Sequence, residues 1–181
     1  MSTLIDYLAE KREALLDRRR RIADGSLGPT PLKARAAAEG RSGVRRIRIR
    51  DFQVITDSPP DFAGYDLGPS SPELVLGALG SCLTHSYLIQ AAALGVPIES
   101  IDVEVEALID PRAGSPGHET TPVYPQNIST VVRIDSPAPA ADVQRLRDNV
   151  ETACPILNLL KNPQMIATRI EHRSSRLAAA E

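Results

Sequence analysis

Apolar residues recur at helical spacing in three segments of the chain. Residues 3–23 carry charged residues between their apolar positions, which predicts an amphipathic helix. Its apolar positions are Leu4, Ile5, Leu8, Leu15 and Leu16. Residues 71–95 are apolar on nearly every side, which indicates a buried central helix. Residues 141–154 carry one apolar stripe, which predicts a helix that covers a core from one side.

Alternation of apolar and polar residues predicts strands between these helices. Residues 101–109 alternate most cleanly, which is typical of a half-buried strand. Residues 44–50 alternate isoleucine with arginine, and residues 52–56 predict the return strand of a hairpin. Residues 128–134 and 165–172 predict two further strands.

The segments between these elements read as a connector and a loop. Residues 24–43 are rich in proline, glycine and alanine, which indicates a connector, and residues 110–126 form a proline-rich loop without periodicity. The basic face of the strand at 44–50 and the acidic face of the strand at 101–109 could lie side by side in one sheet. Cross-strand ion pairing is therefore a simple role for those arginines.

The helix at 71–95 has recognisable start signals. Ser71 can cap it, Pro72 suits the first helical position, and Glu73 suits the positive end of the helix dipole. The helix is long enough to approach the thickness of a bilayer. Polar residues along it, among them His85 and Gln90, favour a protein interior instead.

Length and charge indicate one domain without a nucleic-acid or membrane partner. The chain has 181 residues and a formal net charge of -2, so no global field attracts polyanions. The arginine run 18–21 is interpreted as a solvated helix end. We expect an N-terminal helix and connector at 1–39, a main domain at 40–175 and a short tail at 176–181. The charged N-terminal sequence resembles neither a secretory signal nor an anchor, which predicts a cytoplasmic location.

The chain has two cysteines, each in an apolar helical context. They are either inert packing thiols or a reactive pair. In a reducing cytosol, pairing between them would be transient and catalytic. Cys82 lies too far inside its helix for the dipole to lower its pKa, so a thiolate there needs a cation or a hydrogen-bond donor. Pro155 can begin a new helical turn, which would place Cys154 at an N-cap.

A sulfenic acid formed at Cys82 by a peroxide would condense with a second thiol to a disulfide. No cofactor or metal is expected. His85 follows Cys82 by three residues and could pair with it or, with Cys154, contribute to a metal site. However, no C-x-x-C motif or second closely spaced histidine accompanies it, so a hydrogen-bonded interior histidine is expected.

Three motifs occur in order along residues 40–172: PELVLGALGSC at 72–82, GVPI at 95–98 and ACPI at 153–156. Together they resemble the OsmC/Ohr superfamily. The resemblance implies an α/β (α+β) fold in which central cysteine-bearing helices are surrounded by strongly bent antiparallel sheets. It also implies an intertwined homodimer with active sites at its interface.

The resemblance further implies thiol-dependent reduction of organic hydroperoxides, alkyl or fatty-acid. Cys82 would be the peroxidatic thiol and Cys154 the resolving thiol. A dithiol such as a lipoylated protein would reduce the disulfide. The apolar neighbours of both cysteines favour an organic hydroperoxide over hydrogen peroxide.

The family also pairs an arginine with a glutamate to hold the first cysteine as a thiolate. The turn at 40–43 resembles its G-R-x-G motif, which makes Arg41 the first choice. Arg46, Arg48 and Arg50 remain alternatives. Glu73 matches the glutamate, but nine residues separate it from Cys82 and place the two on opposite faces of a straight helix. A site that uses both Glu73 and Cys82 needs a helix break or a partner subunit. The alternative role of Glu73 is to stabilise the start of the helix by its interaction with the helix dipole.

Two other functions fit the same resemblance. The protein could bind an apolar small ligand without catalysis, with its thiols as passengers. It could also be a redox-regulated interaction protein that uses its N-terminal helix to bind a partner when the disulfide forms.

Overall fold

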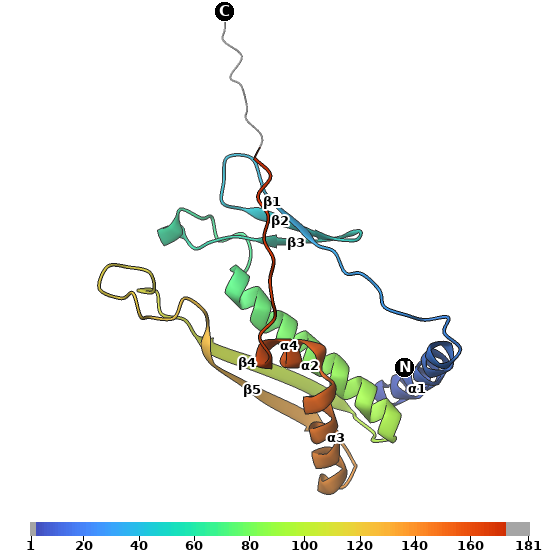
Figure 1. Cartoon of the computed structure of the whole chain (residues 1–181). Helices are drawn as coiled ribbons and strands as arrows, with labels where there is room; N and C mark the ends of the chain where they lie inside the picture. Colours follow the sequence, from blue (N-terminus) through green and yellow to red (C-terminus); the bar gives the residue numbers. More distant parts are fainter. Residues whose placement is uncertain (1–2, 173–181) are drawn as a thin grey trace, which may run out of the picture.

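The computed structural model describes residues 3–172 and has a mixed α/β fold with two small antiparallel sheets (Figure 1). One sheet has the strand order β1-β2-β3 and the other pairs β4 with β5. In chain order the elements are α1 (Leu4–Ala23), β1 (Arg35–Ala38), β2 (Arg45–Ile49), β3 (Phe52–Thr56), the 3-10 helix η1 (Pro60–Phe62), α2 (Ser71–Leu94), β4 (Ser100–Leu108), β5 (Gln126–Asp135), α3 (Ala140–Ala153) and α4 (Pro155–Lys161).

The N-terminal helix α1 is amphipathic, as predicted, and packs against α2. Thr3 and Asp6 form a capping box at its start, which satisfies two backbone donors of the first turn. Leu8 is buried in the core. A guanidinium nitrogen of Arg12 donates to the carbonyl of Ala92 at 3.2 Å, near the negative end of the α2 dipole. The extension is therefore part of the packed structure.

The connector after α1 contains a strand that the sequence pattern did not predict. Strand β1 has the sequence RAAA, and alanine is depleted in strands, so no alternation marked it. It pairs antiparallel with β2, opposite Arg45 to Arg48. The predicted hairpin is confirmed, because β2 pairs antiparallel with β3 from Arg45↔Thr56 to Ile49↔Phe52.

The buried carboxylate of Asp57 organises the loop that leads from β3 into α2. Its Oδ2 accepts hydrogen bonds from the backbone N–H groups of Tyr65 at 3.0 Å and Leu67 at 3.2 Å. A Cβ at Gly64 would overlap the carbonyl of Ser58, so the loop closes only with glycine there. This packing fixes where α2 begins.

Helix α2 runs unbroken from Ser71 to Leu94, close to the predicted bounds. Its N-cap is Ser70, one residue before the predicted cap, and Glu73 completes a capping box. Gly95 ends the helix in the left-handed region at φ 72°. The helix contacts α1, β4, α3 and α4, but its first two turns are largely exposed, so the prediction of a buried helix holds only from Leu79 onward.

Strands β4 and β5 confirm the strands predicted at residues 101–109 and 128–134. Their register runs from Ser100↔Asp135 to Leu108↔Gln126 with one irregularity after Glu106. The inward residues of β4 pack against α2, and two of its outward acids, Asp102 and Glu104, pair with Arg133 of β5, Asp102 at 3.0 Å. Pairing of these acids with the basic strand β2 is therefore a wrong prediction within one chain, since the two strands lie in separate sheets.

Helix α3 covers the core from one side, as predicted, with Leu146 and Val150 buried. The predicted strand at 165–172 does not form in the single chain, because no strand edge of the described residues pairs with it. Met165, Ile166 and Ile170 are instead exposed in an extended segment (Figure 1). The predicted tail at 176–181 lies outside the described residues.

Candidate thiol site

The two cysteines come together where α2 meets the junction of α3 and α4. Cys82 lies midway along α2 and is half-buried, whereas Cys154 is fully buried with 0% exposure. Their Sγ atoms are 3.5 Å apart, and both thiols are free. A disulfide bond is about 2.05 Å long, so a small approach of the two sulfurs would close it.

A break between two helices positions Cys154. Helix α3 ends at Ala153, and Cys154 is the N-cap of α4 with extended backbone at φ -72° and ψ 114°. Pro155 causes this break, because proline disfavours helical geometry in the preceding residue yet suits the first helical position. The predicted new turn after Cys154 is confirmed.

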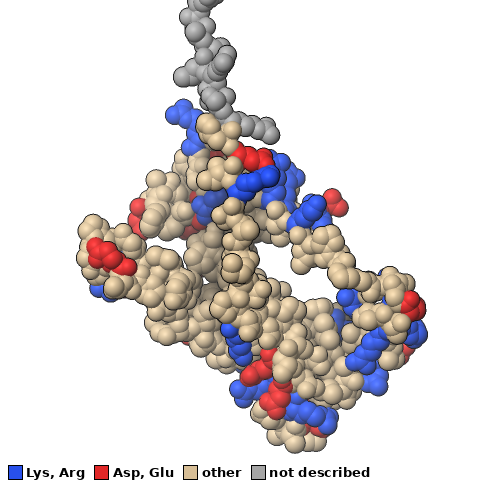
Figure 2. All heavy atoms as spheres, in the orientation of Figure 1, with Lys and Arg blue, Asp and Glu red and all other residues tan. Residues whose placement is uncertain are grey.

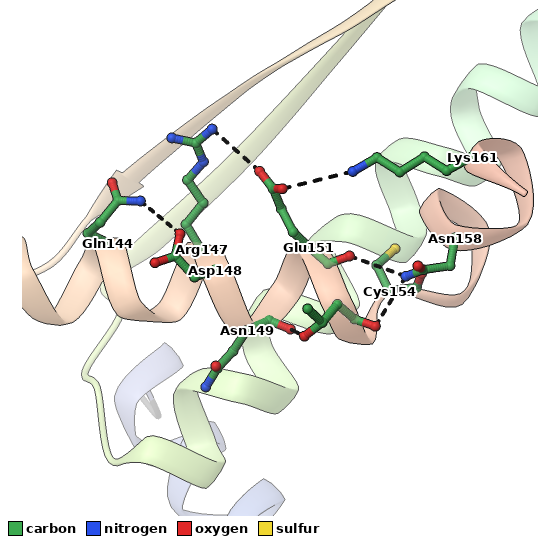
Figure 3. Close-up of polar contacts among 9 residues, drawn as sticks. Gln144, Arg147, Asp148, Asn149, Glu151, Cys154, Asn158 and Lys161 are labelled. Carbon is green, nitrogen blue, oxygen red and sulfur yellow. Dashed lines mark hydrogen bonds and ion pairs between the residues drawn. The ribbon is translucent and has the colours of Figure 1, made fainter.

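The side chain of Asn158 holds the same junction together (Figure 3). Its Nδ2 donates to the carbonyls of Cys154 at 2.9 Å and of Glu151 and Thr152, each at 3.2 Å. These carbonyls belong to the C-terminal end of α3, where helix geometry leaves acceptors without internal partners. Asn158 thereby ties the end of α3 to the first turns of α4 and fixes the backbone that carries Cys154.

Burial raises the pKa of the Cys82 thiol, because a thiolate loses hydration in this environment. The backbone N–H of Ile156 acts against this increase, the Cys154 thiol adds to it, and the hydroxyl of Ser86 also acts against it. Among the described residues, no arginine contributes to the pKa of Cys82. In the single chain the protonated thiol is therefore favoured.

The arginines considered for the site all lie in the β1-β2-β3 region. Arg41 is exposed in the β1–β2 turn. Arg46 pairs with Glu39 at 2.7 Å. Arg48 lies opposite Arg35 in the strand register, and the Arg50 guanidinium stacks 5.0 Å from the ring centroid of Phe52. Within the described residues, the structure joins none of these arginines to Cys82.

Glu73 also lies apart from the cysteines in the single chain. Its Oε2 accepts hydrogen bonds from the backbone N–H and the hydroxyl of Ser70, each at 2.7 Å, and these bonds lower the pKa of the carboxyl. Because α2 is continuous, the helix break that would bring Glu73 to Cys82 is absent from the described chain. A partner subunit is the remaining way to use both residues.

His85 is exposed on α2, which corrects the expectation of an interior histidine. Partial burial lowers the pKa of its imidazole, and nearby Lys11 on α1 lowers it further. Ser86, four residues after Cys82 on the same helix, lowers the pKa of the Cys82 thiol, whereas His85 does not contribute to that pKa. Within residues 3–172 no three His, Cys, Asp or Glu side chains gather in a way that could hold a metal ion.

An apolar groove of about 1010 Å³ lies between α2, β5, α3 and α4, and it is lined by neighbours of the two cysteines rather than by the cysteines themselves. Leu79 and Leu83 line it from α2 on either side of Cys82 in sequence, and Val150 and Leu157 line it on either side of Cys154. Its charged lining residues are Arg147, Glu151 and Lys161. The site therefore combines two adjacent thiols with a largely apolar groove whose three charged lining residues contact one another (Figure 3).

A model of the family described as OsmC-like protein matches residues 64–169, more than half of the chain and both cysteines. The chain belongs to the OsmC-like family. This confirms the family predicted from the three motifs. Comparison with curated protein sequences gives no match.

Solved structures of OsmC-like proteins share the fold at low sequence identity. An OsmC-like protein from Mycoplasma pneumoniae matches with a TM-score of 0.63 and 18% identity, over 74% of this chain and 89% of that one. An organic hydroperoxide resistance protein OsmC from Legionella pneumophila gives 0.54 and 13%, over 75% and 92%. An OsmC-like protein of unknown function from Vibrio cholerae gives 0.57 and 12%, over 72% and 93%. These likenesses support the mixed α/β fold, and they leave the reaction to be argued from the site.

The structure adds three groups that the motifs did not single out: the Ser86 hydroxyl, the Ile156 N–H and the Asn158 amide. Ser86 follows Cys82 by four residues, a helical spacing that brings side chains together and could have identified it. Asn158 also follows Cys154 by four residues, but its bonds depend on the helix break at Pro155. The hydrogen bonds of Asn158 can be predicted only when the arrangement of α3 and α4 around that break is known.

Proposed function

We propose that this protein is a thiol-dependent peroxidase that reduces organic hydroperoxides through Cys82 and Cys154. The observation that carries the proposal is the 3.5 Å separation between the two Sγ atoms, beside an apolar groove. Membership of the OsmC-like family supports it. So does the fold shared with a protein named for organic hydroperoxide resistance.

The proposed cycle has three steps in which atoms and electrons balance. The Cys82 thiolate attacks the terminal oxygen of the hydroperoxide, the O–O bond breaks, and the alkoxide takes up a proton and leaves as an alcohol. Cys82 is then a sulfenic acid. The Cys154 thiol attacks that sulfur, an S–S bond forms, and water leaves. A dithiol such as a lipoylated protein supplies the two electrons that regenerate both thiols.

The first step requires a thiolate, whereas burial favours the thiol in a single chain. We therefore propose that the working unit is a homodimer in which Arg41 of one copy approaches Cys82 of the other and Glu73 orients that arginine. Both residues are exposed in the single chain and free to contact a second copy. An adjacent guanidinium would lower the thiol pKa, because it favours the charged form.

We place this activity in the cytoplasm, where dithiol reductants are available and a disulfide is a transient state. The apolar lining of the groove favours an alkyl or fatty-acid hydroperoxide over hydrogen peroxide. Equal turnover of cumene hydroperoxide and hydrogen peroxide would contradict that preference.

The decisive experiment is a stoichiometric titration of the reduced protein with cumene hydroperoxide and with hydrogen peroxide. Free thiols are counted, and any Cys82–Cys154 disulfide is mapped by mass spectrometry. We expect rapid loss of both thiols with the organic peroxide, loss of the reaction in Cys82→Ser, and a trapped sulfenic acid in Cys154→Ser. Unchanged thiols in the wild-type protein would reject the peroxidase.

The raised pKa of Cys82 favours a second candidate function, a binding protein that holds an apolar ligand in the groove without catalysis. The rate of Cys82 alkylation in the folded dimer discriminates between the two functions. A passenger thiol would react slowly at neutral pH, whereas a peroxidatic thiol would react quickly as its thiolate.

A further inference from the structure

Two cations that share one carboxylate (Figure 3) form the charged part, or polar end, of the lining of the apolar groove. Arg147 of α3 lies 3.4 Å from one oxygen of Glu151, and Lys161 of α4 lies 3.9 Å from the other. All three line the groove, and they are its only charged lining residues among the part of the chain described. The polar end of the groove therefore carries an excess of one positive charge.

Neither cation is saturated by Glu151. A guanidinium has five N–H donors and an ammonium has three, while the two contacts to Glu151 are long for charge-assisted hydrogen bonds. The neighbouring acid Asp148 accepts from Gln144 at 2.9 Å and does not line the groove. Arg147 and Lys161 can thus each accept a second anionic partner without losing the first.

The two cations are equally distant from Cys154 along the sequence. Each lies seven residues from Cys154, Arg147 before it on α3 and Lys161 after it on α4. Seven helical residues span about 10 Å, so each cation lies roughly that far along its helix from Cys154. Apolar residues of α2, β5, α3 and α4 line the rest of the groove, including Leu79, Leu83 and Leu157.

We infer that Arg147 and Lys161 form a head-group subsite that binds the carboxylate of a long-chain hydroperoxide whose apolar chain lies in the groove. The inference rests on the proposed function and adds to it the residues that select the substrate. The groove fits an amphipathic monoanion because its walls are apolar and its polar end has a single excess positive charge. A ligand whose carboxylate binds there would place its apolar chain against Leu79 and Leu83, the lining residues that flank Cys82 on α2.

The test compares an acid with its methyl ester, which have the same chain and differ in head-group charge. For the wild-type protein we expect kcat/KM to be about tenfold higher for linoleic acid hydroperoxide than for its methyl ester, equivalent to about 1.4 kcal/mol. In the double variant Arg147→Gln/Lys161→Gln that preference should disappear, because neither glutamine side chain attracts the carboxylate by charge. Equal turnover of acid and ester by the wild-type protein would overturn the subsite.

Arg145→Gln is the matched control on the same helix. Arg145 is as exposed as Arg147 and also pairs with an acid on its own helix, Asp142 at 3.1 Å, but it does not line the groove. It should retain the preference for the acid. Loss of that preference in Arg145→Gln as well would assign the effect to the general charge of α3 and reject the subsite.

Calorimetric binding of unreactive dodecanoic acid and its methyl ester to the full-length protein separates this inference from the peroxidase itself. If all hydroperoxides are inert but the acid binds tighter than the ester, and only Arg147→Gln/Lys161→Gln removes the difference, the subsite stands and the peroxidase fails. Equal binding of acid and ester rejects the subsite, whatever the outcome with hydroperoxides.

Discussion

The thiol of Cys82 is subject to influences of opposite sign, and their balance determines its reactivity. Burial and the neighbouring Cys154 raise its pKa, while the Ile156 N–H and the Ser86 hydroxyl lower it. Donors favour the thiolate because they hydrogen-bond more strongly to a charged acceptor. The groups that lower the pKa are few, so the loss of one has a measurable consequence.

Replacing Ser86 by alanine should raise the pKa of Cys82 further. In a Cys154→Ser background, which leaves one thiol, we expect the pH at which iodoacetamide alkylation reaches half its maximal rate to move upward. At neutral pH the reaction should slow because the thiolate fraction falls. Ser81→Ala, an exposed change beside Cys82 in sequence, is the control and should leave the profile in place. A profile unchanged in Ser86→Ala would contradict the assigned influence of Ser86.

At this scale the sequence predicted the two thiols but not what surrounds them. Their motifs placed Cys82 in a helix and Cys154 at an N-cap, and the structure has both positions. The spacing of residues in a motif does not predict how deeply a thiol is buried, because burial depends on how α2, α3 and α4 pack together. The rise in the Cys82 pKa therefore could not be predicted from the residues alone.

At the scale of elements, side-chain caps determine where helices begin and where Cys154 lies. Ser70 and Glu73 start α2, and Asn158 joins α3 to α4. Each set of bonds satisfies backbone groups that a helix end leaves without partners. Capping and catalytic roles make different predictions for the same residues.

Glu73→Gln separates a helix-capping role from a catalytic one. Glutamine also completes a capping box, so the urea midpoint should fall only slightly, through the loss of the negative charge at the start of the helix. If Glu73 orients the arginine of a second copy, kcat/KM for cumene hydroperoxide should nevertheless fall about tenfold or more, because a neutral amide holds a guanidinium less firmly. The control Ser70→Ala should lose about 1 kcal/mol of stability. Full activity in Glu73→Gln would assign Glu73 to the cap alone.

Asn158→Leu should weaken the junction that positions Cys154. Three backbone carbonyls lose a donor, which we expect to lower the free energy of unfolding by about 1 kcal/mol and to slow disulfide formation after peroxide addition. Stopped-flow thiol loss measures the second effect. Asn162→Leu is the control, because Asn162 donates only to the carbonyl of Asn158 at 2.7 Å. Equal disulfide rates in wild type and Asn158→Leu would rule out the positioning role.

The sequence predicted those elements whose own residues show a clear alternation of apolar and polar positions. Strand β4 was predictable because its alternation continues through nine residues with one face inward. Strand β1 was not, because its RAAA sequence is a strand only through its pairing with β2. The segment at 165–172 shows the reverse: its residues suit a strand, yet the described chain offers it no partner edge.

At the scale of the whole molecule, the two sheets carry opposite charge, and one extended segment exposes apolar side chains. Basic side chains gather over the β1-β2-β3 sheet, at the top of Figure 2, whereas the acids of β4 lie on the other sheet. Met165 is fully exposed, and Ile166 and Ile170 are 84% and 92% exposed. Exposed apolar residues gathered in one segment indicate an interaction surface.

The proposed homodimer would cover these surfaces, and it predicts a particular mass. Light scattering should give twice the 19.5 kDa mass of the chain. A chain that ends at Asn162 should dissociate at concentrations where the full chain is dimeric, because it lacks the exposed apolar segment. A chain that ends at His172 retains that segment and should remain dimeric. If the Asn162 truncation stays dimeric and fully active, the segment has no part in the interface.

The same truncation links assembly to chemistry. If a second copy supplies Arg41 to Cys82, dissociation should leave the thiol in its single-chain environment, where burial raises its pKa. Alkylation of Cys82 at neutral pH should then slow as the protein is diluted below its dimer dissociation constant, and Arg41→Gln should produce the same slow rate while the dimer stays intact. Slow alkylation in both cases would connect quaternary structure to reactivity through one residue. A rate independent of dilution and of Arg41 would mean that one chain sets the reactivity of Cys82 on its own.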